Sequence, residues 1–258
     1  PASAIVAFCE ATGVTKTNSR KAIEELEAFV RRDLNLTAQR RMAVLRPLKL
    51  VLTNWPVDSE GAPVVEHFEV TNNPENPDDG TRQVAFTGEL WIEADDFAEV
   101  PPPKFFRLSP GREVRLRGAY FVTATDVVKD AEGNVVQVNA TYDPESKGGN
   151  SPDGRKVKST MHWVSAPHAI DATVNLYVRL FTAEVPGAAT GEPLDDLNPK
   201  SREVRTGAKL EAALADVAPG EVVQFERLGY FAADPDAPAT FHRTVGLRDE
   251  WASIQKRG

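Results

Sequence analysis

The chain is organised around one stretch, Phe105-Phe106-Arg107-Leu108-Ser109-Pro110-Gly111-Arg112-Glu113-Val114-Arg115-Leu116-Arg117-Gly118-Ala119-Tyr120. Residues 109–111 are turn sequence, because proline fixes φ and glycine accepts a positive φ. After this turn, apolar and polar side chains alternate along residues 113–122, which is the period of a half-buried β-strand. The stretch therefore predicts a β-hairpin whose turn lies at residues 109–111.

The same stretch carries a local excess of positive charge. From Lys104 to Arg117 there are five basic residues and one acidic residue, in a chain of formal net charge −8. Arginines on a strand beside Phe105 and Phe106 suit contacts with phosphates and base edges. A solvated sheet face with balancing acids nearby is the alternative interpretation.

Composition bounds the class of protein. A chain of 258 residues has room for one large domain or two smaller ones. The net charge of −8 argues against nucleic-acid binding driven by overall charge, but it does not exclude a local basic patch. Cys9 is the single cysteine, which excludes an internal disulfide and indicates a reducing, cytoplasmic compartment. No apolar run or signal peptide predicts membrane insertion or export. A helix so soon after Pro1 suggests a fragment of a longer protein.

Hydrophobic spacing predicts helices first and strands afterwards. Residues 1–38 predict one helix that ends at Gly13 and a second from about Ser19 to Leu34. From Met42 onward the period is two, which predicts a mainly β fold of antiparallel barrels or a sandwich. Loops are expected at residues 143–154 and 183–200. The expected strands lie at residues 48–52, 84–92, 135–142, 157–163, 174–180, 222–231 and 241–247, with one short helix near 209–215.

Catalytic and metal-binding motifs are lacking. His162 and His168 lie near a strand end without the spacing of a zinc site. We interpret acidic pairs such as Asp95-Asp96 and Asp195-Asp196 as solvated loop residues. No phosphate-binding, dinucleotide-binding or nucleophile-elbow motif occurs.

Several phrases occur in a characteristic order along the chain. They include Gly88-Glu89-Leu90-Trp91-Ile92, Gly111-Arg112-Glu113-Val114-Arg115-Leu116-Arg117, Asp153-Gly154-Arg155-Lys156-Val157-Lys158, His162-Trp163-Val164-Ser165, Gln224-Phe225-Glu226-Arg227-Leu228-Gly229-Tyr230-Phe231 and Arg243-Thr244-Val245-Gly246-Leu247-Arg248-Asp249. Together these phrases resemble one family, the glutaminyl-tRNA synthetases of the bacterial and eukaryotic type.

The resemblance implies a helical subdomain at residues 1–38 and two antiparallel anticodon-binding β-barrels at 39–160 and 161–258. It also implies that a strand near residues 42–53 is exchanged between the barrels. The parent enzyme would join glutamine to its tRNA with ATP and Mg²⁺, through a catalytic domain that precedes Pro1. This chain would then recognise tRNA without catalysing a reaction, and it would need no cofactor. Its expected partners are the tRNA and that catalytic domain, and it is expected to be a monomer.

The resemblance also implies which residues touch the anticodon, whose bases are unstacked and held in pockets. Arg107 is expected at the third base, Arg115 at the first, and Arg40 with Gln224 around the middle one. Further expected contacts are Lys104 and Arg227.

Two of these positions depart from the family pattern. Lys104 stands where an amide is expected, and Phe106 where a basic residue is expected.

Other interpretations stay open. Gln224 could satisfy a buried backbone group, and Arg227 could pair with Asp249. The matching region of an archaeal-type glutamyl-tRNA synthetase is the second interpretation, although the phrases favour the glutamine enzyme. A protein-binding scaffold would show an exposed apolar patch, which the sequence does not suggest.

Overall fold

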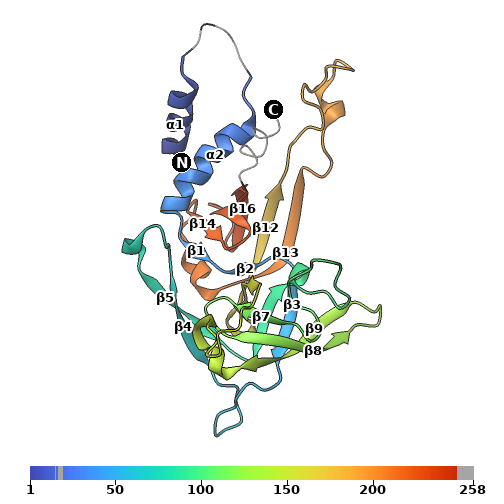
Figure 1. Ribbon diagram of the computed structural model, residues 1–258. Coiled ribbons are helices and arrows are strands. Elements are labelled where there is room, and N and C mark those ends of the chain that lie inside the picture. The colour runs from blue at the N-terminus through green and yellow to red at the C-terminus, as the bar shows by residue number, and fades with distance from the viewer. Residues whose placement is uncertain (15, 17–19, 249–258) are drawn as a thin grey trace. The chain divides into compact units, whose positions relative to one another are not determined.

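The computed structural model describes residues 1–14, 16 and 20–248 (Figure 1). The fold is mainly β with helices near the N-terminus, as the sequence predicts. The helices are α1 (Ala2–Thr12) and α2 (Ile23–Thr37). The strands are β1 (Arg40–Arg41), β2 (Ala43–Val44), β3 (Pro47–Leu52), β4 (Glu66–Thr71), β5 (Thr81–Phe86), β6 (Glu89–Glu93), β7 (Glu113–Leu116), β8 (Phe121–Lys129), β9 (Val135–Asp143), β10 (Thr160–Met161), β11 (Val164–Ser165), β12 (Ile170–Tyr177), β13 (Arg202–Leu210), β14 (Val222–Phe225), β15 (Gly229–Ala233) and β16 (Thr240–Val245).

Short 3₁₀ helices join several of these strands. They are η1 (Pro77–Asp79), η2 (Ala94–Asp96), η3 (Pro144–Gly149), η4 (Ala166–His168), η5 (Pro193–Asp196) and η6 (Ala212–Asp216). Among the described helices, none is both long enough and apolar enough to cross a membrane.

The described residues form two compact units. The barrel unit contains Arg40–Ala172 and Gly207–Asp216. The helical unit contains the described parts of Pro1–Gln39, Thr173–Thr206 and Val217–Gly258. The strands β12 and β13 contribute residues to both units.

The barrel unit is built on one strongly curved sheet with the order β10-β7-β8-β9-β3-β6-β11. Its edge strands β10 and β11 are separated in the chain only by His162 and Trp163, so the two edges of the sheet are drawn together into a nearly closed barrel. Most pairs are antiparallel, but β3–β9 and β10–β7 are parallel. The predicted all-antiparallel pairing is therefore wrong at these two places.

The alternation that predicted strands is visible in the burial of β3. Leu48, Leu50 and Leu52 are buried, whereas Lys49 and Val51 between them are partly exposed. This single buried face is what a curved sheet around one core requires.

A cluster of aromatic rings fills the barrel core. The Phe86 and Trp163 rings are both fully buried, with their centroids 4.8 Å apart and an interplanar angle of 81°. Phe68 and Tyr120 pack on Phe86 at 5.5 and 5.6 Å in the same edge-to-face manner. Such contacts add to the stabilisation from apolar burial.

The central hairpin lies one turn later than predicted. Residues 109–111 do form a turn, in which Arg112 N donates to Ser109 O, but residues 105–108 are not a strand. The observed hairpin joins β7 to β8 (Figure 1), and Leu116 N donates to Tyr120 O across its turn. The second turn is possible because Gly118 adopts a φ of 65°.

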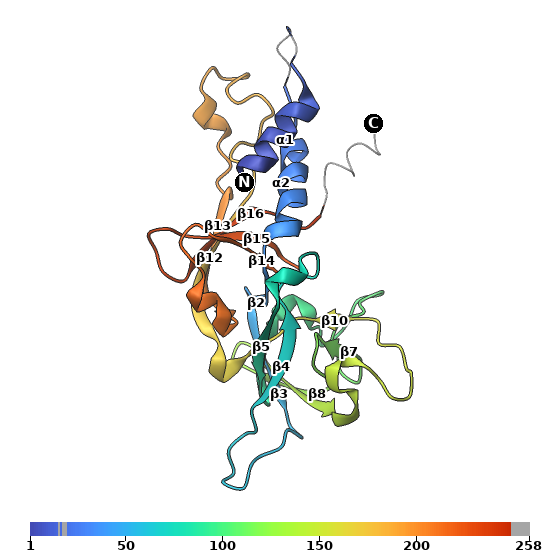
Figure 2. The same ribbon diagram turned by 90° about the vertical axis from the view of Figure 1, so that its left-hand side faces the viewer.

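One predicted strand in the barrel unit is shorter than expected, the strand predicted at residues 84–92 is in fact two strands, β5 and β6, and one strand was missed. Of residues 157–163 only Thr160–Met161 pair with β7, because the polar segment before them makes no ladder. The strand β4 was missed because only Phe68 on it is buried; it pairs with β5 as a ribbon that Figure 2 shows clearly.

The helix expected near residues 209–215 begins later, as η6 (Ala212–Asp216). Lys209 and Leu210 instead end β13 and pair with β2. The strand β13 was also missed, because its residues are mostly exposed and Gly207, at a φ of 79°, interrupts the alternation.

In the helical unit, α1 and α2 lie side by side (Figures 1 and 2). Gly13 caps α1 as predicted, and the Phe8 and Phe29 rings meet edge to face at 5.9 Å. The start of α2 is Ile23 rather than Ser19, which lies outside the described residues. Its buried face, with Leu34, packs on Tyr230 of β15.

The strands of the helical unit follow the order β14-β15-β16-β12-β13, as a half-barrel. The predicted strand at residues 222–231 is in fact the hairpin β14–β15, because Arg227 at a φ of 68° turns the chain. The strand β12 ends at Tyr177, three residues before its predicted end at 180, and pairs in parallel with β16.

Candidate nucleic-acid interface

Arg107 lies in the loop before β7 and is oriented by two acceptors. Its Nη1 is 3.0 Å from Oδ1 of Asp96 and 3.0 Å from the backbone oxygen of Asp95. The Asp96 side chain is 1% exposed, whereas that of Arg107 is 44% exposed. The guanidinium is therefore anchored at one nitrogen, and within the described residues no hydrogen bond of its Nε or Nη2 is recorded.

The backbone around Arg107 is fixed as well. Leu108, fully buried, pairs with Phe97 through a β-bridge, and its N donates to Asp96 O. Asp96, interpreted from sequence as a solvated loop acid, is in fact buried and holds a cation. No sequence signal marks this, because a long loop separates the two residues in the chain.

Phe106 and Lys158 connect this loop to β7. The Lys158 Nζ lies 5.0 Å from the centroid of the Phe106 ring. Next to Lys158, Ser159 O accepts a hydrogen bond from Arg115 N. The loop that carries Arg107 and the strand that carries Arg115 are thus joined through one segment.

Arg115 projects from β7 over an aromatic ring. Its guanidinium carbon lies 5.3 Å from the centroid of Phe121, and its Nε is buried without a hydrogen-bond acceptor in the described chain. A side chain at Gly149 would approach Arg115 Cδ at 3.1 Å, so glycine leaves room for it. An arginine held this way has donors left for a base or a phosphate.

Arg155, by contrast, is fully engaged with the protein. It donates to Glu113 through Nε and Nη2 at 2.8 Å each, to Asp153 at 2.9 Å and to Asp143 at 2.5 Å. These three carboxylates hold the pKa of Arg155 above its usual range. The Arg155 side chain therefore ties the predicted loop at residues 143–154 to β7, through Asp143, Asp153 and Glu113.

Lys104 is exposed in the loop before Arg107, at a φ of 65°. In the part of the chain that the structure describes, no carboxylate lies within ion-pair distance of Lys104, Lys156 or Lys158. We use the name basic strip for six exposed or partly exposed residues of the loop before β7, of β7 and of the segment before β10, which are Lys104, Phe106, Arg107, Arg115, Lys156 and Lys158.

Arg40, also in the barrel unit, is held by the protein. Its N donates to Asn72 O at 2.6 Å, and its Nη2 lies 3.9 Å from Glu75 Oε1. The side chain is only 18% exposed. RNA would have to replace the contact with Glu75.

Gln224 and Arg227 belong to the helical unit. Gln224 is buried in β14, opposite Tyr230, and its N donates to Gln39 O. Arg227 is exposed at the turn between β14 and β15. The suggested partner Asp249 lies outside the described residues. Of the six predicted contact residues, the barrel unit therefore contains four and the helical unit two. Those in the barrel unit are Lys104, Arg107 and Arg115 of the basic strip and Arg40, and those in the helical unit are Gln224 and Arg227.

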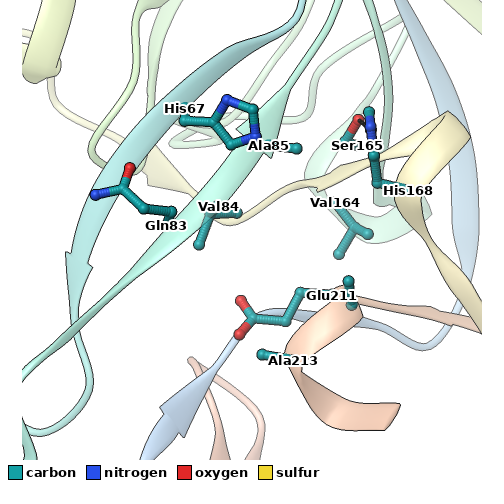
Figure 3. A pocket seen from close by; sticks show the side chains of 10 residues that line it. His67, Gln83, Val84, Ala85, Val164, Ser165, His168, Glu211 and Ala213 are labelled. Atoms are coloured by element: carbon teal, nitrogen blue, oxygen red, sulfur yellow. Dashed lines mark hydrogen bonds between the residues drawn. The ribbon is translucent and has the colours of Figure 1, made fainter.

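A cavity of about 240 Å³ lies elsewhere in the barrel unit (Figure 3). Thr87 Oγ1 donates its proton to Glu89 O at 2.8 Å, so Ser165, 3.1 Å away, must donate to Thr87. The Ser165 oxygen then accepts from Nδ1–H of His168 at 2.9 Å. His168 does not take a proton from Ser165, and the pair is not an activated nucleophile. The cavity is lined by His67, Gln83, Val84, Ala85, Val164, Ser165, His168, Glu211, Ala212 and Ala213.

The acid of this cavity is also engaged. Glu211 accepts two hydrogen bonds from Arg82, at 2.6 and 2.9 Å. Within the described residues, no group of three or more His, Cys, Asp or Glu side chains is placed to hold a metal ion. The basic strip is therefore the stronger candidate for a binding surface.

Two family models match the chain, both described as the anti-codon binding domain of the class I tRNA synthetases (E and Q). They match residues 38–143 and 160–234. The chain belongs to this family of anticodon-binding domains.

Three similar curated proteins share one name. The chain is 52% identical to the glutamine–tRNA ligase of Nitrobacter hamburgensis, over 100% of this chain and 45% of the relative. It is 52% identical to that of Rhodopirellula baltica, over 98% of this chain and 42% of the relative. It is 47% identical to that of Vibrio parahaemolyticus, over 100% and 46%. The chain thus spans less than half the length of these relatives.

Proposed function

We propose that this chain recognises the anticodon of glutamine tRNA, as the anticodon-binding part of a glutamine–tRNA ligase. Family membership and the names of the relatives support the proposal. The observation that carries it is Arg107, whose guanidinium is anchored at Nη1 by a buried carboxylate and keeps two donors available. A pre-oriented fork of this kind suits bidentate recognition of a base.

The proposed target of Arg107 is the third anticodon base. Glutamine anticodons end in G and glutamate anticodons end in C. The O6 and N7 atoms of G are both acceptors and match the arginine fork, whereas C presents an amino donor there. Arg107 would thus favour glutamine tRNA over glutamate tRNA.

Arg115 is proposed to contact the first anticodon base through its Nη donors, because its guanidinium lies over the Phe121 ring and only its Nε is recorded as buried without a partner in the described chain. Lys104 supplies further positive charge in the loop that carries Arg107. Contacts from Arg40, Gln224 and Arg227 to the RNA are also proposed, each to be tested by its own alanine variant.

The activity of the longer protein is part of the proposal. It would join glutamine to tRNA with ATP and Mg²⁺, and neither is assigned to the residues of this chain. A role in translation would place the protein in the cytoplasm, and we expect a monomer.

The test compares two anticodon stem-loops that differ only in the third base, G or C. Arg107→Ala should cost on the order of 1–3 kcal/mol against G and much less against C. Arg46→Ala is the matched control, because Arg46 also pairs with the Asp95-Asp96 turn, through Asp95, and is similarly exposed.

Three outcomes count against the proposal. An equal loss for both loops would reduce Arg107 to a phosphate contact. No loss for either would remove Arg107 from the interface. Tighter binding of the C loop by the unmodified chain would favour the glutamate alternative.

A further inference from the structure

Phe106 is an exposed aromatic side chain in a loop that is otherwise well fixed. Its side chain is 50% exposed, although Leu108, two residues later, is fully buried. All the other phenylalanines that the structure describes are buried or partly buried. An accessible aromatic ring beside charged side chains offers a flat apolar face that a ligand can cover.

The position of the ring is set before any ligand arrives. Phe105 N donates to Pro102 O at 3.1 Å, and the Arg112 side chain donates to Phe105 O. The Lys158 ammonium lies 5.0 Å from the centroid of the Phe106 ring. Such a cation–π contact holds the ring while half of its side chain stays accessible.

The surroundings of the ring select the chemistry of its ligand. Lys104 and Lys158 have no acidic partner in the described chain, and the adjacent Arg107 presents donors. A ligand that suits these side chains has a flat apolar group to stack on the aromatic ring and negative charges to pair with the cations around it. Single-stranded RNA has this chemistry, because unstacked bases lie on aromatic side chains while phosphates meet basic ones.

We propose that Phe106 is a stacking platform for an unpaired nucleobase, the same base whose edge Arg107 contacts. This inference rests on the proposed function and deepens it. Stacking is tolerant of base identity, so Phe106 supplies affinity while Arg107 supplies discrimination.

The experiment measures binding of the 258-residue chain to two stem-loops, one with G at the third anticodon position and one with an abasic site there. Phe106→Ala should weaken binding of the G loop about 10-fold to 100-fold. It should change binding of the abasic loop by less than about twofold, because no base is left to stack. Phe106→Tyr should keep the affinity for the G loop, whereas Phe106→Leu should lose most of it.

The matched control is Val57→Ala. Val57 is 60% exposed and lies in a loop of the same unit that bridges to Pro63. This variant should bind both loops as the unmodified chain does. Thermal unfolding of each variant checks that the fold is unchanged.

The failures are distinguishable. If the unmodified chain binds the G loop and Phe106→Ala binds it equally well, the stacking proposal is wrong and the proposed function stands. An equal loss for the G and abasic loops would make Phe106 a structural residue of its loop. If the unmodified chain binds neither loop, the proposed function fails, and the stacking role fails with it.

Discussion

Asp96 Oδ1 lies 3.0 Å from Arg107 Nη1, and the acid is buried whereas the base is not. A buried carboxylate is costly unless it is paired, so this contact is maintained in the free protein. It also decides which edge of the guanidinium faces outward. The backbone oxygen of Asp96 also accepts a hydrogen bond from Leu108 N. Orientation of Arg107 is thus built into the barrel unit before RNA binds.

Asp96→Asn tests that orientation. The amide keeps the size of the side chain but weakens its hold on the guanidinium, because charge-assisted hydrogen bonds are roughly twice as strong as neutral ones. We expect discrimination between the G and C stem-loops to fall by about 1 kcal/mol, with a smaller change in binding of the C loop. Binding titrations of both loops measure this. Unchanged discrimination would show that Asp96 does not orient Arg107 for recognition.

A second prediction concerns salt. The basic strip is local and the chain has a net charge of −8, so few phosphates are neutralised on binding. A plot of log affinity for the stem-loop against log salt should have a shallow slope, equivalent to a few ions at about 0.7 per phosphate. Isothermal titrations between low and moderate salt provide the plot. A slope as steep as that of a strongly basic protein would indicate non-specific binding.

A third prediction concerns Gly88 in the barrel unit. A Cβ at this position would lie 2.8 Å from Cβ and Cγ of Trp55, whose ring packs on Phe86. Gly88→Ala should therefore lower the free energy of unfolding by about 1–3 kcal/mol through overpacking. Gly246→Ala is the control, because a Cβ there meets nothing within 4 Å and its φ is not positive. Chemical denaturation compares the two, and an equal effect would contradict the predicted clash.

A fourth prediction concerns Asp153 at the 143–155 loop. The Ser151 hydroxyl, then the Arg155 backbone N–H and side chain, lower its pKa to about 2. A lowered pKa means that these contacts stabilise the fold above the unfolded pKa of about 3.9, and that the stabilisation is lost as the pH falls toward 2.

Removal of the Arg155 side chain should shift that titration. In Arg155→Met the Asp153 midpoint, followed by carboxyl NMR, should rise toward its ordinary value. Asp130 is an internal control, because its pKa is lowered chiefly by Asn134 and should not move. A midpoint for Asp153 that stays near 2 would show that Ser151 and the backbone suffice.

A fifth prediction concerns catalysis. The sequence has no nucleotide-binding motif, so an ATP–pyrophosphate exchange assay with glutamine should give only background with this chain. Exchange well above background by the purified chain, absent from a mock preparation, would overturn its assignment as a recognition module alone.

The sequence alone was sufficient to predict the fold class of this protein, its family and the loop that carries Arg107. The period-two pattern predicted a mainly β fold, since side chains alternate between the core and solvent along every half-buried strand, as Leu48, Leu50 and Leu52 show. Ordered phrases identified the family, and the local charge excess pointed to the loop of Arg107. These are properties of short segments, so they can be read without knowledge of the pairing of those segments.

Only the tertiary structure decided which turn closes the central hairpin and which acid meets Arg107. Both Pro110-Gly111 and Arg117-Gly118 are able to turn the chain, and the choice depends on Leu108 pairing with Phe97 rather than with β7. Asp96 precedes Phe97 of this bridge, and its buried carboxylate contacts the Arg107 guanidinium. Contacts between segments distant in sequence depend on how the sheet closes around its core, and no local pattern encodes that closure.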